Sequence, residues 1–194
     1  YDFLYAGAGY GGSCFPKDVK ALIKTAADDA GIHLKVLQAV EEANDAQKHV
    51  LGNKVLARFG GALQGKHFAL WGLAFKAETD DVRESPALPL IGWLREQRAT
   101  VVGYDPAAMP TLRALIGDDI TYAADEYAAA VGADALVVLV EWKQFRSPDF
   151  RRLADTMACP AVLDARNLWD PIDLEARGFD YRGVGRPGGA PRAA

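Results

Sequence analysis

A cysteine, a lysine and an aspartate lie within five residues of one another near the start of the chain, as Cys14, Lys17 and Asp18. Pro16 is typical of the first turn of a helix, so Cys14 is expected just before a helix N-terminus. There the positive end of the helix dipole and free backbone N–H groups favour a thiolate. Lys17 adds a positive charge, and Asp18 could hold a water or a proton near the thiolate. This arrangement is typical of covalent catalysis at a carbonyl carbon, with Cys14 and Asp18 as catalytic residues.

The second cysteine, Cys159, precedes Pro160 and an apolar run and has no such neighbours. It is interpreted as a small buried hydrophobe, and the same structural role is the alternative for Cys14. The histidines do not cluster with either cysteine, so no metal site is expected.

The run Gly7-Ala8-Gly9-Tyr10-Gly11-Gly12 satisfies the G-x-G-x-x-G pattern of dinucleotide-binding turns. That fingerprint requires a strand before it and a second strand after the following helix. Here only a few residues precede the run, and a second helix follows the first. We therefore reject the dinucleotide interpretation and expect a loop whose backbone adopts positive φ or lies against a ligand.

Two helices are expected next, one from Pro16 to Gly31 and a longer amphipathic one over residues 34–59. A helix of that length is about 40 Å long and needs a surface on which to bury its apolar stripe. Intrachain packing is one possibility, and a homodimer formed through this helix is the other. Glycines at positions 60, 61 and 65 mark a boundary after it.

The remainder alternates strand and helix patterns. Strands are expected over residues 67–73, 100–104, 120–122, 135–140, 161–164 and 181–184. Helices are expected over residues 86–96, 110–116, 125–131 and 150–157. Such alternation predicts a parallel sheet covered on both faces, with ligands at the carboxyl ends of its strands.

The composition of the 194 residues, half hydrophobic and a quarter charged, excludes collagen-like, disordered and disulfide-rich classes. A net charge of -4 gives no general attraction to nucleic acid. No apolar stretch is long enough for a membrane span and no secretory leader is visible, so a cytoplasmic location is expected. Because the chain begins at Tyr1, it is expected to be a piece of a longer protein. The tail at 187–194 is expected to be disordered.

Several motifs together resemble one family. The run from Gly9 to Asp18 resembles the active-site cysteine motif of the UDP-glucose/GDP-mannose dehydrogenases. The segments 72–76 and 79–86 resemble the opening of their nucleotide-sugar domain, and Tyr104-Asp105-Pro106, Glu141-Trp142 and Asp164-Ala165-Arg166-Asn167 follow in the expected order. The resemblance implies an α/β fold: a helical dimerisation segment (1–62), then a Rossmann-like parallel-sheet UDP-sugar-binding domain (63–186).

The resemblance also implies a chemistry, most similar to that of the members acting on UDP-glucose. The C6 alcohol of UDP-glucose would be oxidised in two hydride transfers to NAD, through a thiohemiacetal and a thioester on Cys14. The product would be UDP-glucuronate. Asp18 would position the hydrolytic water. In the family the NAD-binding domain precedes the cysteine motif, so this chain alone is expected to be inactive.

Site residues carry over from the matching motifs. The nucleotide sugar would be bound by Phe3, Leu4, Tyr5, Ala6, Gly7, Gly11, Phe75, Lys76 and Arg166. NAD would be contacted by Lys17 and Arg83. Three alternatives stay open: GDP-mannose or another UDP-sugar as substrate, a non-catalytic nucleotide-sugar-binding module, and a pure interaction domain built on the long helix.

Overall fold

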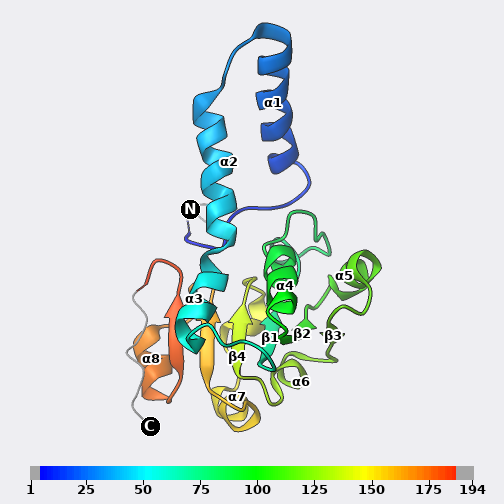
Figure 1. Cartoon of the computed structure of the whole chain (residues 1–194). Helices are drawn as coiled ribbons and strands as arrows, with labels where there is room; N and C mark the ends of the chain where they lie inside the picture. The colour runs from blue at the N-terminus through cyan, green and yellow to red at the C-terminus, as the bar shows by residue number, and fades with distance from the viewer. Residues whose placement is uncertain (1–4, 187–194) are drawn as a thin grey trace.

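The computed structural model describes residues 5–186. The first two helices, α1 (Phe15–Ala30) and α2 (Lys35–Lys48), form a hairpin that projects from a sheet domain, and α3 (Val50–Phe59) lies against that domain (Figure 1). The expected tail at 187–194 and the site residues Phe3 and Leu4 lie outside the described residues.

The helix ends follow the sequence signals. Pro16 is in the first turn of α1, and Gly31 ends that helix in the left-handed conformation with φ 65°. Gly60 ends α3 in the same way, with φ 62°. A residue without Cβ adopts this conformation at little cost, which is why glycine is common at helix C-termini.

The prediction of one long helix over 34–59 was wrong at His49, where α2 ends and α3 begins. The two parts pack on different surfaces: α2 lies along α1, whereas α3 packs on α4 and β5 of the sheet domain. Gly52 of α3 faces the Trp93 ring of α4, which a Cβ at this position would contact at 3.4 Å. The change of packing partner accounts for the change of direction.

The sheet has six strands, all parallel, in the order β3-β2-β1-β4-β5-β6. They are β1 (His67–Trp71), β2 (Thr100–Tyr104), β3 (Thr121–Tyr122), β4 (Ala135–Val138), β5 (Ala161–Asp164) and β6 (Asp180–Gly183). The order reverses between β1 and β4, as in the Rossmann type of doubly wound sheet. Right-handed crossovers that leave this point in opposite directions place their helices on opposite faces.

Five further helices connect the strands: α4 (Ala87–Glu96), α5 (Met109–Ile116), α6 (Glu126–Ala130), α7 (Phe150–Thr156) and α8 (Pro171–Ala176). The sequence analysis missed α8 and the short 3-10 helix Lys143–Arg146. Asp170 and Pro171 are a cap and a first-turn residue, since the Asp170 carboxylate accepts from two backbone N–H groups of α8. This local signal would have located the helix.

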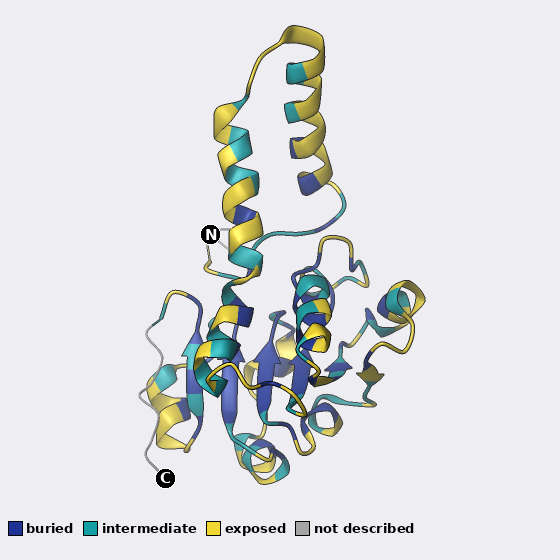
Figure 2. Ribbon diagram, viewed as in Figure 1, coloured by how far each residue is buried: buried dark blue, intermediate teal, exposed yellow. Residues whose placement is uncertain are grey.

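The core is the sheet and the helices packed on it, whereas α1 and much of α2 are exposed (Figure 2). All four residues of β4 and of β5 are buried, as expected for parallel strands covered on both faces. Three of the tryptophans are buried, namely Trp71, Trp142 and Trp169. Within residues 5–186, no helix has the length and apolar character that a membrane crossing requires.

Candidate functional site

Three of the sequence-predicted site residues, Phe75, Lys76 and Arg166, follow the carboxyl ends of β1 and β5, close to the point where the strand order reverses between β1 and β4. Phe75 and Lys76 follow β1, Glu141 follows β4, and Arg166 follows β5. Because carboxyl ends of parallel strands meet at one edge, residues distant in the sequence come together there, where open α/β sheets bind ligands.

Asp105 connects the loops after β1, β2 and β4. Its fully buried carboxylate accepts from the backbone N–H groups of Leu73 (2.7 Å) and Ala74 (3.2 Å) after β1, and from the Trp142 ring N–H (3.2 Å) after β4. It also caps its own turn by accepting from the N–H groups of Ala107 and Ala108. The loops after β1, β2 and β4 are therefore held together by one carboxylate, which the sequence indicated only as part of the Tyr104-Asp105-Pro106 motif.

Asp164 does the same after β5. Its buried carboxylate accepts from the N–H of Arg166 (2.9 Å) and from the hydroxyl of Tyr181 (3.0 Å). Burial raises the pKa of Asp164, although the hydrogen bonds it accepts act in the opposite direction. These bonds fix the turn that carries Arg166.

The Gly-rich loop, residues 5–13, crosses these strand ends, and its glycines lie where a side chain would not fit. A Cβ on Gly7 would lie 2.8 Å from Arg166 Nη1, and one on Gly12 would lie 2.8 Å from the Phe75 ring. A Cβ on Gly11 would overlap the carbonyl oxygen of Glu84. At these three positions the glycines allow the loop to pack closely on the sheet domain.

Cys14 is exposed and immediately precedes α1. Its Sγ lies 3.6 Å from Ser13 Oγ. The N–H of Gly12, two residues earlier, donates to the carbonyl of Arg83 at 2.9 Å, which places the cysteine beside the loop after β1. The thiol is therefore accessible and not walled in by hydrocarbon, so the alternative of a buried structural cysteine does not describe Cys14.

Arg83 lies near this thiol. Its guanidinium makes a two-pronged contact with Asp81, with Nε–Oδ1 2.9 Å and Nη2–Oδ2 2.8 Å. The hydrogen-bonded Asp81 raises the pKa of Arg83, and the negative charge of Cys14 adds a smaller effect in the same direction. The guanidinium of Arg83 is thus paired with a carboxylate on the loop beside the cysteine.

Asp18, the second predicted catalytic residue, lies in the first turn of α1, four residues after Cys14. Its carboxylate pairs with Lys17 at 3.1 Å, and both side chains are exposed. The one hydrogen bond between Asp18 and Cys14 among the described residues is the first bond of the helix, from the Asp18 N–H to the Cys14 carbonyl. Lys17 and Asp18 thus form a charged pair in the first turn of α1.

Arg166, one of the predicted substrate residues, is paired with Glu141 beside the Gly-rich loop. Its Nε lies 2.5 Å from Glu141 Oε2 and its Nη2 lies 2.8 Å from Glu141 Oε1, so its third nitrogen, Nη1, is the one nearest Gly7. Lys76 is exposed, with its Nζ 5.5 Å from the centre of the Phe75 ring. Tyr5 and Ala6 are exposed on the Gly-rich loop.

Sequence reasoning missed a polar face of α2 that contacts the Gly-rich loop. Four residues at helical spacing form it: Glu41, Asn44, Gln47 and Lys48. The hydroxyl of Tyr10 donates to Glu41, and burial together with this contact raises the pKa of Tyr10. These polar residues are visible in the sequence at helical spacing, but only the apolar stripe of the helix over 34–59 was considered.

Lys48 extends this face to the sheet domain. Its Nζ lies 2.8 Å from Glu84 Oε2, while Lys20 Nζ of α1 lies 3.0 Å from Glu84 Oε1. The hydrogen bond from Lys48, followed by that from Lys20, lowers the pKa of Glu84. Glu84 itself has φ 54°, an uncommon conformation for a residue with a side chain.

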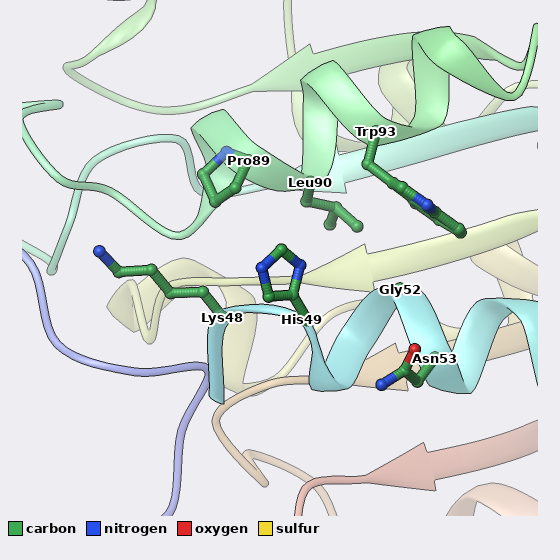
Figure 3. Close-up of a pocket in the computed structure, with 7 residues that line it drawn as sticks. All are labelled: Lys48, His49, Gly52, Asn53, Pro89, Leu90 and Trp93. Carbon is green, nitrogen blue, oxygen red and sulfur yellow. The ribbon is translucent and has the colours of Figure 1, made fainter. Parts of the chain in front are cut away.

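Two hollows lie beside Lys48, between the helices and the sheet domain. A groove of about 40 Å³ between α3 and α4 is lined by Gly52, Asn53, Leu90 and Trp93, among others (Figure 3). A wider hollow of about 490 Å³ adjoins it near His49 and Pro89. Neither contains a sequence-predicted site residue. Among residues 5–186, no group of three or more potential metal-ligating side chains gathers.

An α/β domain with this strand order, and with a cysteine-bearing loop packed across its switch point, belongs to the class that holds a ligand at strand ends. Family models narrow the class. Residues 69–171 match the UDP binding domain of the UDP-glucose/GDP-mannose dehydrogenase family, and residues 1–46 match its central domain. The chain therefore belongs to the UDP-glucose/GDP-mannose dehydrogenase family, the nucleotide-sugar oxidoreductases whose motifs it resembled.

Individual proteins of this family are similar to the chain in sequence and structure. The chain is 45% identical over 185 residues to the UDP-glucose 6-dehydrogenase of Rhizobium meliloti and 46% identical over 190 residues to that of Pseudomonas aeruginosa. Each match covers 95% of this chain and 42% of the relative, so the chain spans less than half the length of these proteins. The structure of a UDP-glucose dehydrogenase from Pyrobaculum islandicum matches with TM-score 0.79 and 34% identity, over 93% of this chain and 39% of that one.

Proposed function

We propose that the chain is the C-terminal part of an NAD-dependent UDP-glucose 6-dehydrogenase, in which Cys14 forms a covalent bond to the substrate. The observation that carries the proposal is the position of Cys14. Its thiol is exposed at the start of α1, on a loop packed against Phe75 and Arg166 at the strand ends. The names of the similar proteins supply the substrate.

The chain's own chemical role is to capture an aldehyde. The Cys14 thiolate would add to the aldehyde carbon at C6 of the sugar, and the oxygen would take a proton, giving a thiohemiacetal. Loss of a hydride from that carbon and of the hydroxyl proton gives a thioester. Water then attacks the thioester and releases the carboxylate and the thiol. NAD would accept the hydrides of the two oxidation steps.

The residues of this chain could contact NAD at one side only. Lys17 and Arg83 are exposed cations next to Cys14, suited to contact a dinucleotide. The G-x-G-x-x-G run is packed against protein, however, and leaves no cradle for a pyrophosphate. We propose that NAD is bound mainly by a part of the protein outside this chain and that the chain alone does not turn over.

For the nucleotide sugar, Arg166 would contact the UDP part through its Nη1, while Phe75, Lys76 and the loop from Phe3 to Gly7, with Gly11, would line the sugar. Asp18, paired with Lys17, would act on the hydrolytic water. The site is assigned to the boundary between a helical segment, residues 1–62, and a UDP-binding domain, residues 63–186. A cytoplasmic location, where UDP-sugars and NAD are available, is part of the same proposal.

The deciding experiment uses the two cysteines of the chain. Iodoacetamide labelling is followed by mass spectrometry of the peptides that contain Cys14 and Cys159, with and without UDP-glucose. UDP-glucose should slow labelling of Cys14 several-fold and leave Cys159, which lies beside Arg58, unchanged. Equal labelling of Cys14 in both samples would contradict the proposal, and stronger protection by GDP-mannose would assign a different sugar nucleotide.

The inactivity of the chain alone has its own test. Incubation with UDP-glucose and NAD should give no NADH above a Cys14→Ala control. Steady NADH formation would show that the chain holds NAD by itself.

A further inference from the structure

The α2 face that contacts the Gly-rich loop contains a buried amide. Asn44 is 6% exposed and is the one buried polar residue of α1, α2 and α3 within the described residues 5–186. Buried polar side chains are nearly always hydrogen-bonded, so the partners of Asn44 indicate what it does.

Both partners are backbone groups of Tyr10. Asn44 Oδ1 accepts from the Tyr10 N–H at 2.7 Å, and Nδ2 donates to the Tyr10 carbonyl at 3.3 Å. The orientation of the amide follows from this pairing, because only its oxygen can accept from an N–H. One turn further along α2, Gln47 Nε2 donates to the Gly7 carbonyl at 2.6 Å. These side chains provide the hydrogen bonds that a neighbouring strand would otherwise supply to the loop.

The approach of the loop to α2 is close enough to constrain the sequence. Gly9 has φ 93°, and a Cβ there would lie 2.8 Å from Asn44 Oδ1. The glycine and the asparagine therefore form a matched pair, since a side chain at position 9 would displace the amide from Tyr10.

The anchored residue is connected to the cysteine on both sides. The Tyr10 ring packs edge-on against Phe15, the residue after Cys14, with ring centres 5.0 Å apart. Two residues after Tyr10, the Gly12 N–H is bonded to the Arg83 carbonyl. Movement of Tyr10 would therefore move the segment that contains Cys14.

We propose that Asn44, assisted by Gln47, is a positioning residue that holds the Gly-rich loop so that Cys14 faces the nucleotide-sugar site. This inference rests on the proposed role of Cys14. Neither amide contacts the sulfur, and both act through Tyr10 and Gly7.

The test measures amide hydrogen exchange by NMR in the 194-residue chain and in Asn44→Ala. Exchange at Tyr10 should accelerate about tenfold or more, because its acceptor is removed. Exchange at Gly12 should accelerate as well, although Gly12 is bonded to Arg83 and not to Asn44. The amide of Leu70 in β1 should be unchanged. An unchanged Gly12 amide would overturn the proposal, because the effect of Asn44 would then end at Tyr10.

Two variants serve as controls. Asn44→Asp keeps an oxygen for the Tyr10 N–H and should retain protection at Tyr10 within about threefold. Asn53→Ala makes the same truncation at an exposed position of α3, in the groove of Figure 3, and should leave Tyr10 and Gly12 unchanged. Equal acceleration in Asn53→Ala would attribute the effect to general loosening and reject the positioning role.

The link to Cys14 is measured by UDP-glucose protection against iodoacetamide. Gln47→Ala removes one hydrogen bond from a half-buried position, so it tests the proposal even if Asn44→Ala does not fold. Both variants should lower the protection factor of Cys14 at least threefold, and an unchanged factor in Gln47→Ala would reject the role of this face. If UDP-glucose fails to protect Cys14 in the unaltered chain, the proposed function fails, while Gly12 exchange still decides the role of Asn44.

Discussion

Glycines 7, 9, 11 and 12 face different parts of the protein, and a Cβ at each position would come too close to a different neighbour. Gly7 faces Arg166, Gly9 faces Asn44, and Gly12 faces the Phe75 ring. Gly11 is the most restricted because the atom it meets is a backbone oxygen, that of Glu84, which cannot move by a rotamer change. At the scale of single residues, the absence of side chains at these four positions allows the loop to pack closely against its neighbours.

Gly11→Ala should therefore destabilise the chain by about 1–3 kcal/mol, because an added methyl in a packed position forces backbone shifts. Urea unfolding measures the loss of free energy. Gly92→Ala is the matched control: a Cβ at Gly92, in the exposed face of α4, meets nothing within 4 Å. It should stabilise by about 0.5–1 kcal/mol, since alanine is the better helix former. A neutral Gly11→Ala would show that the loop is not packed on Glu84.

At the scale of elements, Asp105 is the connection among the loops after β1, β2 and β4. Replacing it by asparagine puts an NH₂ group where one carboxylate oxygen accepts, so at least two buried N–H groups lose a partner. Asp105→Asn should lower the free energy of unfolding by about 2–5 kcal/mol. Asp149→Asn is the control, because Asp149 caps α7 through a single oxygen and asparagine caps equally well. Similar losses in both variants would contradict the special role of Asp105.

The hairpin of α1 and α2 is tied to the sheet domain by Glu84, which pairs with Lys48 and Lys20. Because these lysines lower the pKa of Glu84, its contribution to stability is present above the unfolded pKa of about 4.3 and is lost as the pH falls through the folded value. The Glu84 side chain is 40% exposed, so water screens the pairs and the contribution is about 1 kcal/mol or less.

Glu84→Gln should accordingly be less stable than the unaltered chain near neutral pH, and the difference should shrink below about pH 4. Unfolding free energies over a pH series measure it. In the Glu84→Gln background, Lys48→Met should have no further effect. A difference that persists unchanged in acid would assign the destabilisation to the strained backbone at Glu84 and not to its charge.

At the scale of the whole molecule, much of the surface of the α1–α2 hairpin is not covered by the rest of the chain. Several large apolar side chains on it are exposed, including Phe15, Leu22, Ile32 and Val36, the last at 77%. Exposed apolar groups that gather on a projecting element are typical of protein interfaces. We propose that a homodimer forms through this hairpin, so that its interface includes α1 as well as part of the helix over 34–59 through which a homodimer was one expectation.

A charge placed on this surface should separate the subunits. Val36→Glu combined with Leu22→Glu should convert a dimer to a monomer in sedimentation experiments. Ile172→Glu is the control, since Ile172 is equally exposed, at 78%, on α8 of the sheet domain. A monomeric unaltered chain, or a dimer that persists in the double variant, would contradict the proposal.

Local patterns were sufficient for most elements. Strand and helix alternation after residue 65 predicted the parallel sheet, and Gly31 and Gly60 ended their helices as expected. The break at His49 was not predictable in the same way, because it arises where α2 and α3 meet different packing partners. Cys14, Lys17 and Asp18 were found from their spacing, but the pairing of Asp18 with Lys17 was not.

The sequence by itself determined the chemistry available, namely one cysteine before a helix and an alternating α/β pattern, because these depend on neighbours within a few residues. The tertiary structure alone decided which distant groups support that cysteine. Asn44 meets Tyr10 across 34 positions, and Lys48 meets Glu84 across 36. Such contacts depend on how helices pack on a sheet, and no local periodicity encodes which side chain of a helix will face a loop.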